Sequence, residues 1–177
     1  GYYFFKYCME NLSDEEKKNI YYVIDKKAPD YEKIKEYDDH IIQFMSLKHV
    51  LYVLAAVLYV ASDSRTHLYA WRCKTSLIRS KIDKRPIFFL QHGVTALKQV
   101  GPLFGRKGSS PMTYFATTSK FEQDIVVKYL DYSEAKSPIT GFTRWDVLED
   151  TSTKDDKLIL LMPTWRSWLE EVSDEDF

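Results

Sequence analysis

The chain has 177 residues, of which 45% are hydrophobic and 15% aromatic, so it can bury one substantial core but is too short for two domains of ordinary size. Its formal net charge of −1 carries no signature of a nucleic-acid-binding protein. The longest apolar run, residues 50–61, is shorter than the roughly 20 residues that span a bilayer. No signal peptide is expected, because the first residues have no charged region followed by a cleavage site.

The first part of the chain predicts short, alternating elements. In chain order we expect a helix-like apolar patch at 2–9, a strand at 20–24, a short charged helix at 30–36, a strand at 41–44, a helix capped by Ser46, and a strand at 57–61. The last of these strands ends in the polar sequence Ser62-Asp63-Ser64.

The remaining elements continue the alternation. We expect a basic amphipathic helix or structured loop at 68–82, a strand opened by Pro86, a Gly- and Pro-rich loop at 101–111, a strand at 113–117, a helix capped by Ser119, a brief strand at 138–140, a helix-like segment at 143–148, a polar linker at 151–156 and a buried strand at 157–162. Ser119 and Glu122 match the S-x-x-E capping box. The βαβα order predicts an α/β fold with a Rossmann-like parallel sheet.

His92 is the strongest candidate for chemistry. It follows the apolar residues 88–90 and precedes Gly93, and in parallel sheets the ligand crevice lies beyond the carboxyl ends of the strands. Imidazole is the side chain that exchanges a proton near neutral pH, and a glycine lets backbone approach a ligand. The alternative is a histidine that merely ends a strand.

Charge is unevenly distributed along the chain. Residues 65–107 contain ten Lys or Arg and one acid, Asp83, whereas residues 149–177 contain nine acids and three bases. A basic block around His92 suits an anionic substrate or an anionic membrane surface. An ordinary solvated helix face explains residues 72–85 equally well.

Several classes of site are poorly supported. Cys8 and Cys73 have no CxxC or zinc spacing, which argues for a reducing compartment and against a disulfide framework. The chain has no G-x-G-x-x-G and no G-x-S-x-G, so neither a dinucleotide site nor an α/β-hydrolase nucleophile is indicated. We therefore expect no metal and no cofactor.

Four motifs occur in a fixed order: QHGVTALK at 91–98, TTSKFE at 117–122, TGFTRWDVL at 140–148 and MPTWR at 162–166. Together they resemble the CDP-glycerol glycerophosphotransferase family, the teichoic-acid polymerases and primases. The resemblance extends over residues 3–166. One His-Gly pair is a weak signal, but four motifs in order are a strong one.

The resemblance implies a GT-B fold, in which two Rossmann-like halves face one another across the active site. It makes residues 1–150 the N-terminal, acceptor-side domain, and residues 151–177 the linker and first elements of a truncated donor-side domain. Both termini are read as cut edges of a longer protein. The isolated 177 residues are accordingly expected to have little or no turnover.

The resemblance also implies the reaction and its residues. His92 would be the base that activates an acceptor hydroxyl, which attacks CDP-glycerol or CDP-ribitol and expels CMP. The substrate- or phosphate-binding residues would be Gly93, Lys98, Ser119, Arg144, Thr164 and Arg166. The acceptor would be a lipid-linked polyol phosphate or glycan, at the cytoplasmic face of the cell membrane, with the protein bound peripherally.

Two features depart from the family pattern. The lysine usually lies one residue closer to the histidine than Lys98 does, and the donor-binding half with its second histidine is not among residues 1–177. A nucleotide-sugar glycosyltransferase of GT-B fold and a non-catalytic module that binds a partner or anionic lipid are the alternatives.

Other polar residues have plainer interpretations. His40 and His49 lie beside apolar segments and are expected to be structural or surface residues, whereas His67 lies in the basic region and could meet an acceptor. The carboxylate of Asp146 is expected to stabilise the N-terminus of a helix rather than bind a substrate. Thr164 and Arg166 fit two roles equally well: contact with a phosphate, or contact that holds the two halves together.

Overall fold

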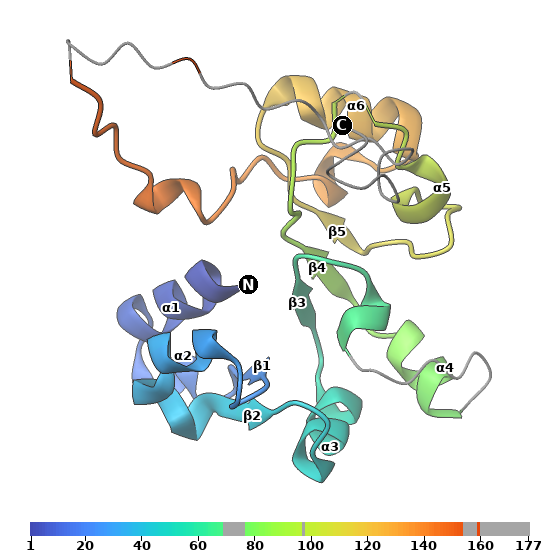
Figure 1. Ribbon diagram of the computed structural model, residues 1–177. Coiled ribbons are helices and arrows are strands. Elements are labelled where there is room, and N and C mark those ends of the chain that lie inside the picture. Colours follow the sequence, from blue (N-terminus) through green and yellow to red (C-terminus); the bar gives the residue numbers. More distant parts are fainter. Residues whose placement is uncertain (69–76, 97, 154–158, 160–177) are drawn as a thin grey trace, which may run out of the picture. The chain divides into compact units, whose positions relative to one another are not determined.

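The computed structural model describes residues 1–68, 77–96, 98–153 and 159. The chain divides into two units, residues 1–147 and 148–177. In the second unit, the carboxylate of Asp150 accepts hydrogen bonds from the backbone N–H and the hydroxyl of Ser152, at 3.0 and 2.6 Å. The helices and strands named below all lie in the first unit (Figure 1).

The strands of the first unit are short, and helices separate most of them. The strands are β1 (Tyr22–Ile24), β2 (Ile41–Gln43), β3 (Tyr59–Ala61), β4 (Ile87–Phe89) and β5 (Tyr114–Phe115). The α-helices are α1 (Tyr2–Asn11), α2 (Asp14–Lys17), α3 (Leu47–Ala55), α4 (Leu77–Asp83), α5 (Gly101–Phe104) and α6 (Lys120–Leu130). The 3₁₀ helices are η1 (Pro29–Lys33), η2 (Lys35–His40), η3 (Arg65–Leu68), η4 (Glu134–Lys136) and η5 (Trp145–Val147).

The strands pair in parallel, as the βαβα order predicts, but they form two sheets rather than one. β1 pairs with β2, and β3, β4 and β5 form a second sheet in that order. The smaller sheet has its own core, because Phe5, Cys8 and Met9 of α1 pack with Ile34 and Ile41. Burial raises the pKa of the Cys8 thiol. The α/β class with parallel sheets is confirmed, and the expectation of a single sheet is wrong.

Four predicted elements differ from those in the structure, and one of them is the loop expected at 101–111, which contains α5 (Gly101–Phe104). The charged helix expected at 30–36 is replaced by η1 and η2, which meet at Ile34. The strand expected at 138–140 is a single parallel bridge between Thr117 and Ile139, and the helix expected at 143–148 is the one-turn η5. Pro138 begins the bridge segment, and because proline has no backbone N–H it limits how far a parallel ladder extends.

Helix caps were partly predictable. The Ser46 hydroxyl accepts from the backbone N–H of His49 at 3.1 Å, and the Ser119 hydroxyl accepts from that of Glu122 at 3.2 Å, so both N-caps are confirmed. The second hydrogen bond of the predicted capping box, from the backbone N–H of Ser119 to the carboxylate of Glu122, is not formed. That carboxylate instead accepts hydrogen bonds from Thr118. A complete capping box occurs at Ser13 and Glu16, at the start of α2.

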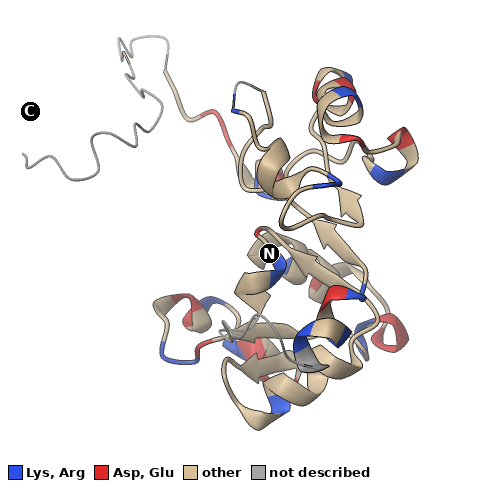
Figure 2. Ribbon diagram, turned by 90° about the vertical axis from the view of Figure 1, so that its right-hand side faces the viewer, with Lys and Arg blue, Asp and Glu red and all other residues tan. Residues whose placement is uncertain are grey.

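The basic block does not form a uniform charged face. Its Arg65 is buried and donates to the backbone carbonyls of Ile82 and Arg85 at 3.4 and 2.5 Å. Arg79 pairs with Asp83 at 2.7 Å. Figure 2 shows Lys and Arg interspersed with Asp and Glu along the helices. Among the described residues, no helix is both long and apolar enough to cross a membrane.

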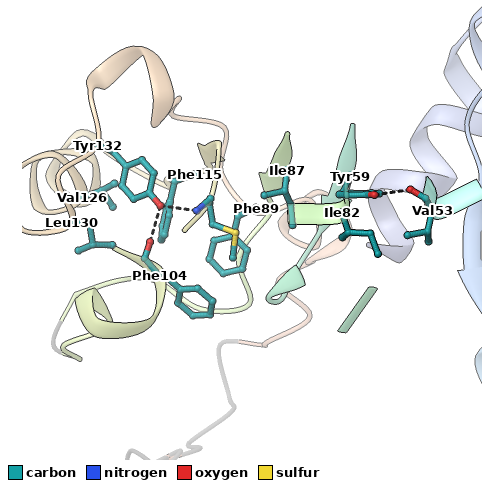
Figure 3. Close-up of a cluster of buried hydrophobic side chains, with 11 residues drawn as sticks. Val53, Tyr59, Ile82, Ile87, Phe89, Phe104, Phe115, Val126, Leu130 and Tyr132 are labelled. Atoms are coloured by element: carbon teal, nitrogen blue, oxygen red, sulfur yellow. Dashed lines mark hydrogen bonds between the residues drawn. The ribbon is translucent and has the colours of Figure 1, made fainter. Parts of the chain in front are cut away.

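The larger sheet is built on an aromatic core (Figure 3). Phe115 of β5 is fully buried and lies 5.0 Å from Phe89 of β4 and 5.6 Å from Tyr132, measured between ring centroids. The Tyr132 hydroxyl accepts from the backbone N–H of Met112 at 2.8 Å and donates to the carbonyl of Phe104 at 2.7 Å. This buried hydroxyl therefore ties the loop before β5 to α5.

His49 of α3 is a structural histidine, as its apolar surroundings predict. It is buried; Nδ1 accepts from the backbone N–H of Met45 at 3.1 Å, and Nε2 lies 2.8 Å from the carbonyl of Leu68. A carbonyl only accepts, so Nε2 carries the proton and Nδ1 the lone pair. Desolvation lowers the pKa of the imidazole, and a proton added to Nδ1 would face the Met45 N–H.

This burial predicts a pH-dependent stability. Because the pKa of His49 is lower in the folded chain than in the unfolded chain, the unfolded state binds more protons below the ordinary imidazole pKa of about 6.5. The free energy of unfolding should therefore fall as the pH drops from 7.5 to 5. Urea denaturation across that range should show a steeper fall for the wild type than for His49→Gln. Parallel curves would contradict the prediction.

Candidate active site

Polar residues gather where the strands of the larger sheet end. β3 leads into Ser62, β4 into Leu90, Gln91 and His92, and β5 into Ala116, Thr117 and Thr118. The ladder continues past the strands, with Leu90 N–H donating to Ala61 at 2.8 Å and Ala116 N–H donating to Phe89 at 2.9 Å. Because the strands are parallel, all these carboxyl ends lie at one edge of the sheet.

His92 sits at this edge in a defined tautomer. Its Nδ1 lies 2.8 Å from the backbone carbonyl of Ser62, and a carbonyl can only accept, so Nδ1 carries the proton. In the neutral ring the lone pair is then on Nε2, for which no protein partner is found among the described residues. The ring is exposed and packs at an angle against Phe89 and Phe104, with centroids 6.0 and 6.3 Å away. This geometry presents a basic nitrogen to solvent.

Arg144 is brought to the same place from 52 residues further along the chain. Its guanidinium donates to the backbone carbonyl of His92 at 3.3 Å and lies over the ring of Phe142, 4.5 Å from its centroid. The contact with Phe142 limits the orientations of the guanidinium plane. A cation held next to a base suits a reaction between an alcohol and a phosphate ester.

The residue before His92 has an unusual backbone conformation, and there is free space around the backbone of the residue after it. Gln91 has φ of +62°, a left-handed conformation that costs a residue with a side chain about 1 kcal/mol or more. Its buried amide donates to the carbonyl of Ala116 and to Glu122, which holds it there. At Gly93 an added Cβ would meet nothing within 4 Å, so a ligand can approach its backbone.

Sequence reasoning missed Glu122 as part of this site. Its side chain is fully buried, and its carboxylate accepts hydrogen bonds from Gln91, Thr95 and Thr118. The sequence carried two signals at this residue, its place at the end of the TTSKFE motif and the S-x-x-E pattern, and the second explained it as a helix cap. The polar residues at 91, 95 and 118 gave no indication of a common partner.

The remaining sequence candidates lie in different settings. Ser119 is exposed at the N-terminus of α6, next to Thr118, and Lys98 is exposed on the segment that follows Thr95. Thr164 and Arg166 fall outside the described residues. Among the residues that are described, no group of three or more His, Cys, Asp or Glu is placed to hold a metal ion.

A cavity of about 630 Å³ adjoins the end of β3. Its wall includes Ser62, Asp63 and His67 together with the aromatic residues Tyr21, Tyr22, Phe44, Tyr52 and Tyr59. Asp63 and His67 are in contact, with 3.3 Å between Oδ1 and Nδ1. Ser62 therefore borders the cavity and also binds His92 through its carbonyl.

Comparison with known proteins bears on this arrangement. A model of the CDP-glycerol:poly(glycerophosphate) glycerophosphotransferase family matches residues 3–174. The chain is also similar to the minor teichoic acid biosynthesis protein GgaB of Bacillus subtilis (strain 168), with 30% identity over 168 residues. That match covers 92% of this chain but spans only 17% of the length of GgaB. No solved structure gives a significant match.

Proposed function

The chain belongs to the CDP-glycerol:poly(glycerophosphate) glycerophosphotransferase family, and from this premise we propose that it forms the acceptor side of a polyol-phosphate transferase of teichoic acid synthesis. The donor is CDP-glycerol or CDP-ribitol. The acceptor is the hydroxyl of a lipid-linked polyol phosphate or glycan. The similarity to GgaB, whose name places it in minor teichoic acid biosynthesis, supports the same pathway class.

The observation that carries this proposal is the state of His92. The Ser62 carbonyl holds the proton on Nδ1, so Nε2 is the atom that takes the proton of the acceptor hydroxyl. The hydroxyl oxygen then attacks the phosphorus that bears the polyol. A new P–O bond forms, the bond to the bridging diphosphate oxygen breaks, and CMP leaves with that oxygen. The proton remains on the imidazole until it passes to solvent or to CMP.

Positively charged side chains would stabilise the negative charge on the phosphate oxygens during the reaction. Arg144 donates a hydrogen bond to the carbonyl of His92 at 3.3 Å, and we propose that its remaining N–H groups contact phosphate oxygens. Guanidinium binds phosphate oxygens in pairs. We assign Lys98, Thr164 and Arg166 to further phosphate contacts. Ser119 and Gly93 supply a hydroxyl and backbone approach at the same edge.

The family membership supports a proposal about the architecture. We propose that residues 1–150 form the N-terminal Rossmann-like half of a GT-B fold, and that residues 151–177 link it to the donor-side half. Parallel β3, β4 and β5 with their polar carboxyl ends support this assignment.

The site of action is proposed to be the cytoplasmic face of the cell membrane, with peripheral binding. The basic residues of 65–107 that are described and exposed support an attraction to anionic lipid; they are Lys81, Lys84, Lys98, Arg106 and Lys107. Arg65 contributes nothing to this attraction, because it is buried.

The proposal is tested with the full-length protein that contains this chain. Incubation with CDP-glycerol, and separately with CDP-ribitol, in the presence of membrane-extracted acceptor should release CMP and transfer the polyol phosphate. CMP is measured by liquid chromatography and transfer with a radiolabelled donor. Release of a nucleoside diphosphate from a nucleotide sugar, without CMP from either CDP-polyol, would overturn the proposal in favour of a glycosyltransferase.

A further inference from the structure

We propose that Glu122 is the positioning residue of this active site: its buried carboxylate ties the loop that carries His92 to the loop that follows β5. This inference rests on the proposed function for its kinetic consequence. Its structural content depends only on hydrogen bonds within the chain. Glu122 itself is too deeply buried to touch a substrate.

Both carboxylate oxygens are used, and each serves a different loop. Oε1 accepts from the side-chain amide of Gln91 at 3.1 Å and from the backbone N–H of Thr95 at 2.5 Å. Oε2 accepts from the backbone N–H and the hydroxyl of Thr118, at 2.6 and 2.7 Å. All four partners are donors. An ionised carboxylate is an acceptor only, so it satisfies all of them at once.

The residues bound by Oε1 of Glu122 lie on both sides of His92 in the sequence. Gln91 precedes the histidine and Thr95 follows it by three residues, so Glu122 fixes both sides of the segment 92–94. A further bond, from the Thr95 hydroxyl to the side-chain carbonyl of Gln91 at 3.1 Å, closes the loop on itself. The bond from Nδ1 to Ser62 then sets the direction of the ring.

The backbone of the loop that carries His92 shows why these hydrogen bonds to Glu122 are needed. The loop from 91 to 95 contains no helix or strand, and it begins with the left-handed Gln91. A loop with few backbone bonds of its own would allow the imidazole to move. Displacing a reacting group by about 1 Å can lower a rate about 100-fold. Glu122 supplies, from the first turn of α6, the rigidity that the loop lacks.

Glutamine at position 122 separates a positioning role from a packing role. Glu122→Gln keeps the size of the side chain but has one acceptor oxygen and a donating NH₂ group, so it can serve one loop and must oppose a donor of the other. Asp124→Asn is the matched control, because Asp124 lies on the same helix and its carboxylate forms an exposed pair with Lys120 at 3.1 Å.

The experiment uses the full-length protein and two readouts. Per folded molecule, kcat for CMP release should fall about 10- to 100-fold in Glu122→Gln with KM nearly unchanged, and should be unaffected in Asp124→Asn. Hydrogen exchange followed by NMR should show the wild-type amides of Thr95 and Thr118 protected like strand amides. In Glu122→Gln at least one of them should exchange faster.

The outcomes are distinguishable. Fast exchange of the wild-type Thr95 amide would overturn the proposal whether or not the variant folds. So would wild-type kcat in a folded Glu122→Gln. If the wild type releases no CMP, the proposed function fails, while the exchange data still decide whether Glu122 holds the loop.

Discussion

Replacing His92 with alanine should lower the turnover of the full-length protein about 10²- to 10⁴-fold, the range that general bases contribute. The Nε2 lone pair is the basic group that the structure presents at the sheet edge, with Nδ1 committed to Ser62. CMP release by the variant and by the wild type, measured under identical conditions, checks this effect.

The loss must be separated from unfolding. His92 is exposed, so His92→Ala should change the free energy of unfolding by only about 0.5 kcal/mol. His40→Gln is a suitable control: its Nδ1 lies 2.9 Å from the carbonyl of Ile20, beside the smaller sheet. Turnover should survive this second substitution. Equal losses in the two variants, or full activity in His92→Ala, would contradict the assigned role.

Replacing Phe115 with alanine should lower the free energy of unfolding by about 3–5 kcal/mol, the usual cost of removing a buried phenylalanine. Phe115 has no exposed surface and contacts Phe89 and Tyr132 in the centre of the aromatic core. The cavity left behind would lie directly beneath the edge that carries His92. Urea denaturation followed by tryptophan fluorescence measures the effect.

Phe121 provides the matched control, because it is the same residue type and is 71% exposed on α6. Phe121→Ala should change stability by about 0.5 kcal/mol or less. A small effect at Phe115 would mean that the aromatic cluster is not the core that holds the larger sheet together. A large effect at Phe121 would mean that its ring is buried in solution against a surface outside this chain.

Much of the fold could be predicted because its signals are local. The apolar run before His92 indicates a buried strand, and Ser46 and Ser119 lie immediately before apolar residues at helical spacing, so β4, α3 and α6 were expected. The same locality explains the errors. Pairing of β1 with β2 in a separate sheet depends on α1 packing beneath it, and no pattern within the strands encodes that contact.

The candidate site was predictable only where a single residue gives a local signal. His92 was found because a titratable ring follows a strand, and Arg144 because it lies in a matching motif. Glu122 was assigned to a helix cap, since a spacing of three residues has one local explanation, whereas its partners at 91 and 95 lie 31 and 27 positions away in sequence. Long-range hydrogen bonds leave no periodic trace in a sequence.

The hydrogen-bond acceptor for His92 has a consequence for engineering this protein. It is a main-chain oxygen of residue 62, and no exchange of side chain removes it. Libraries at position 62 can therefore reshape the wall of the neighbouring cavity while the imidazole keeps its proton on the same nitrogen. Acceptor preference can thus be altered without changing which nitrogen of His92 acts as the base.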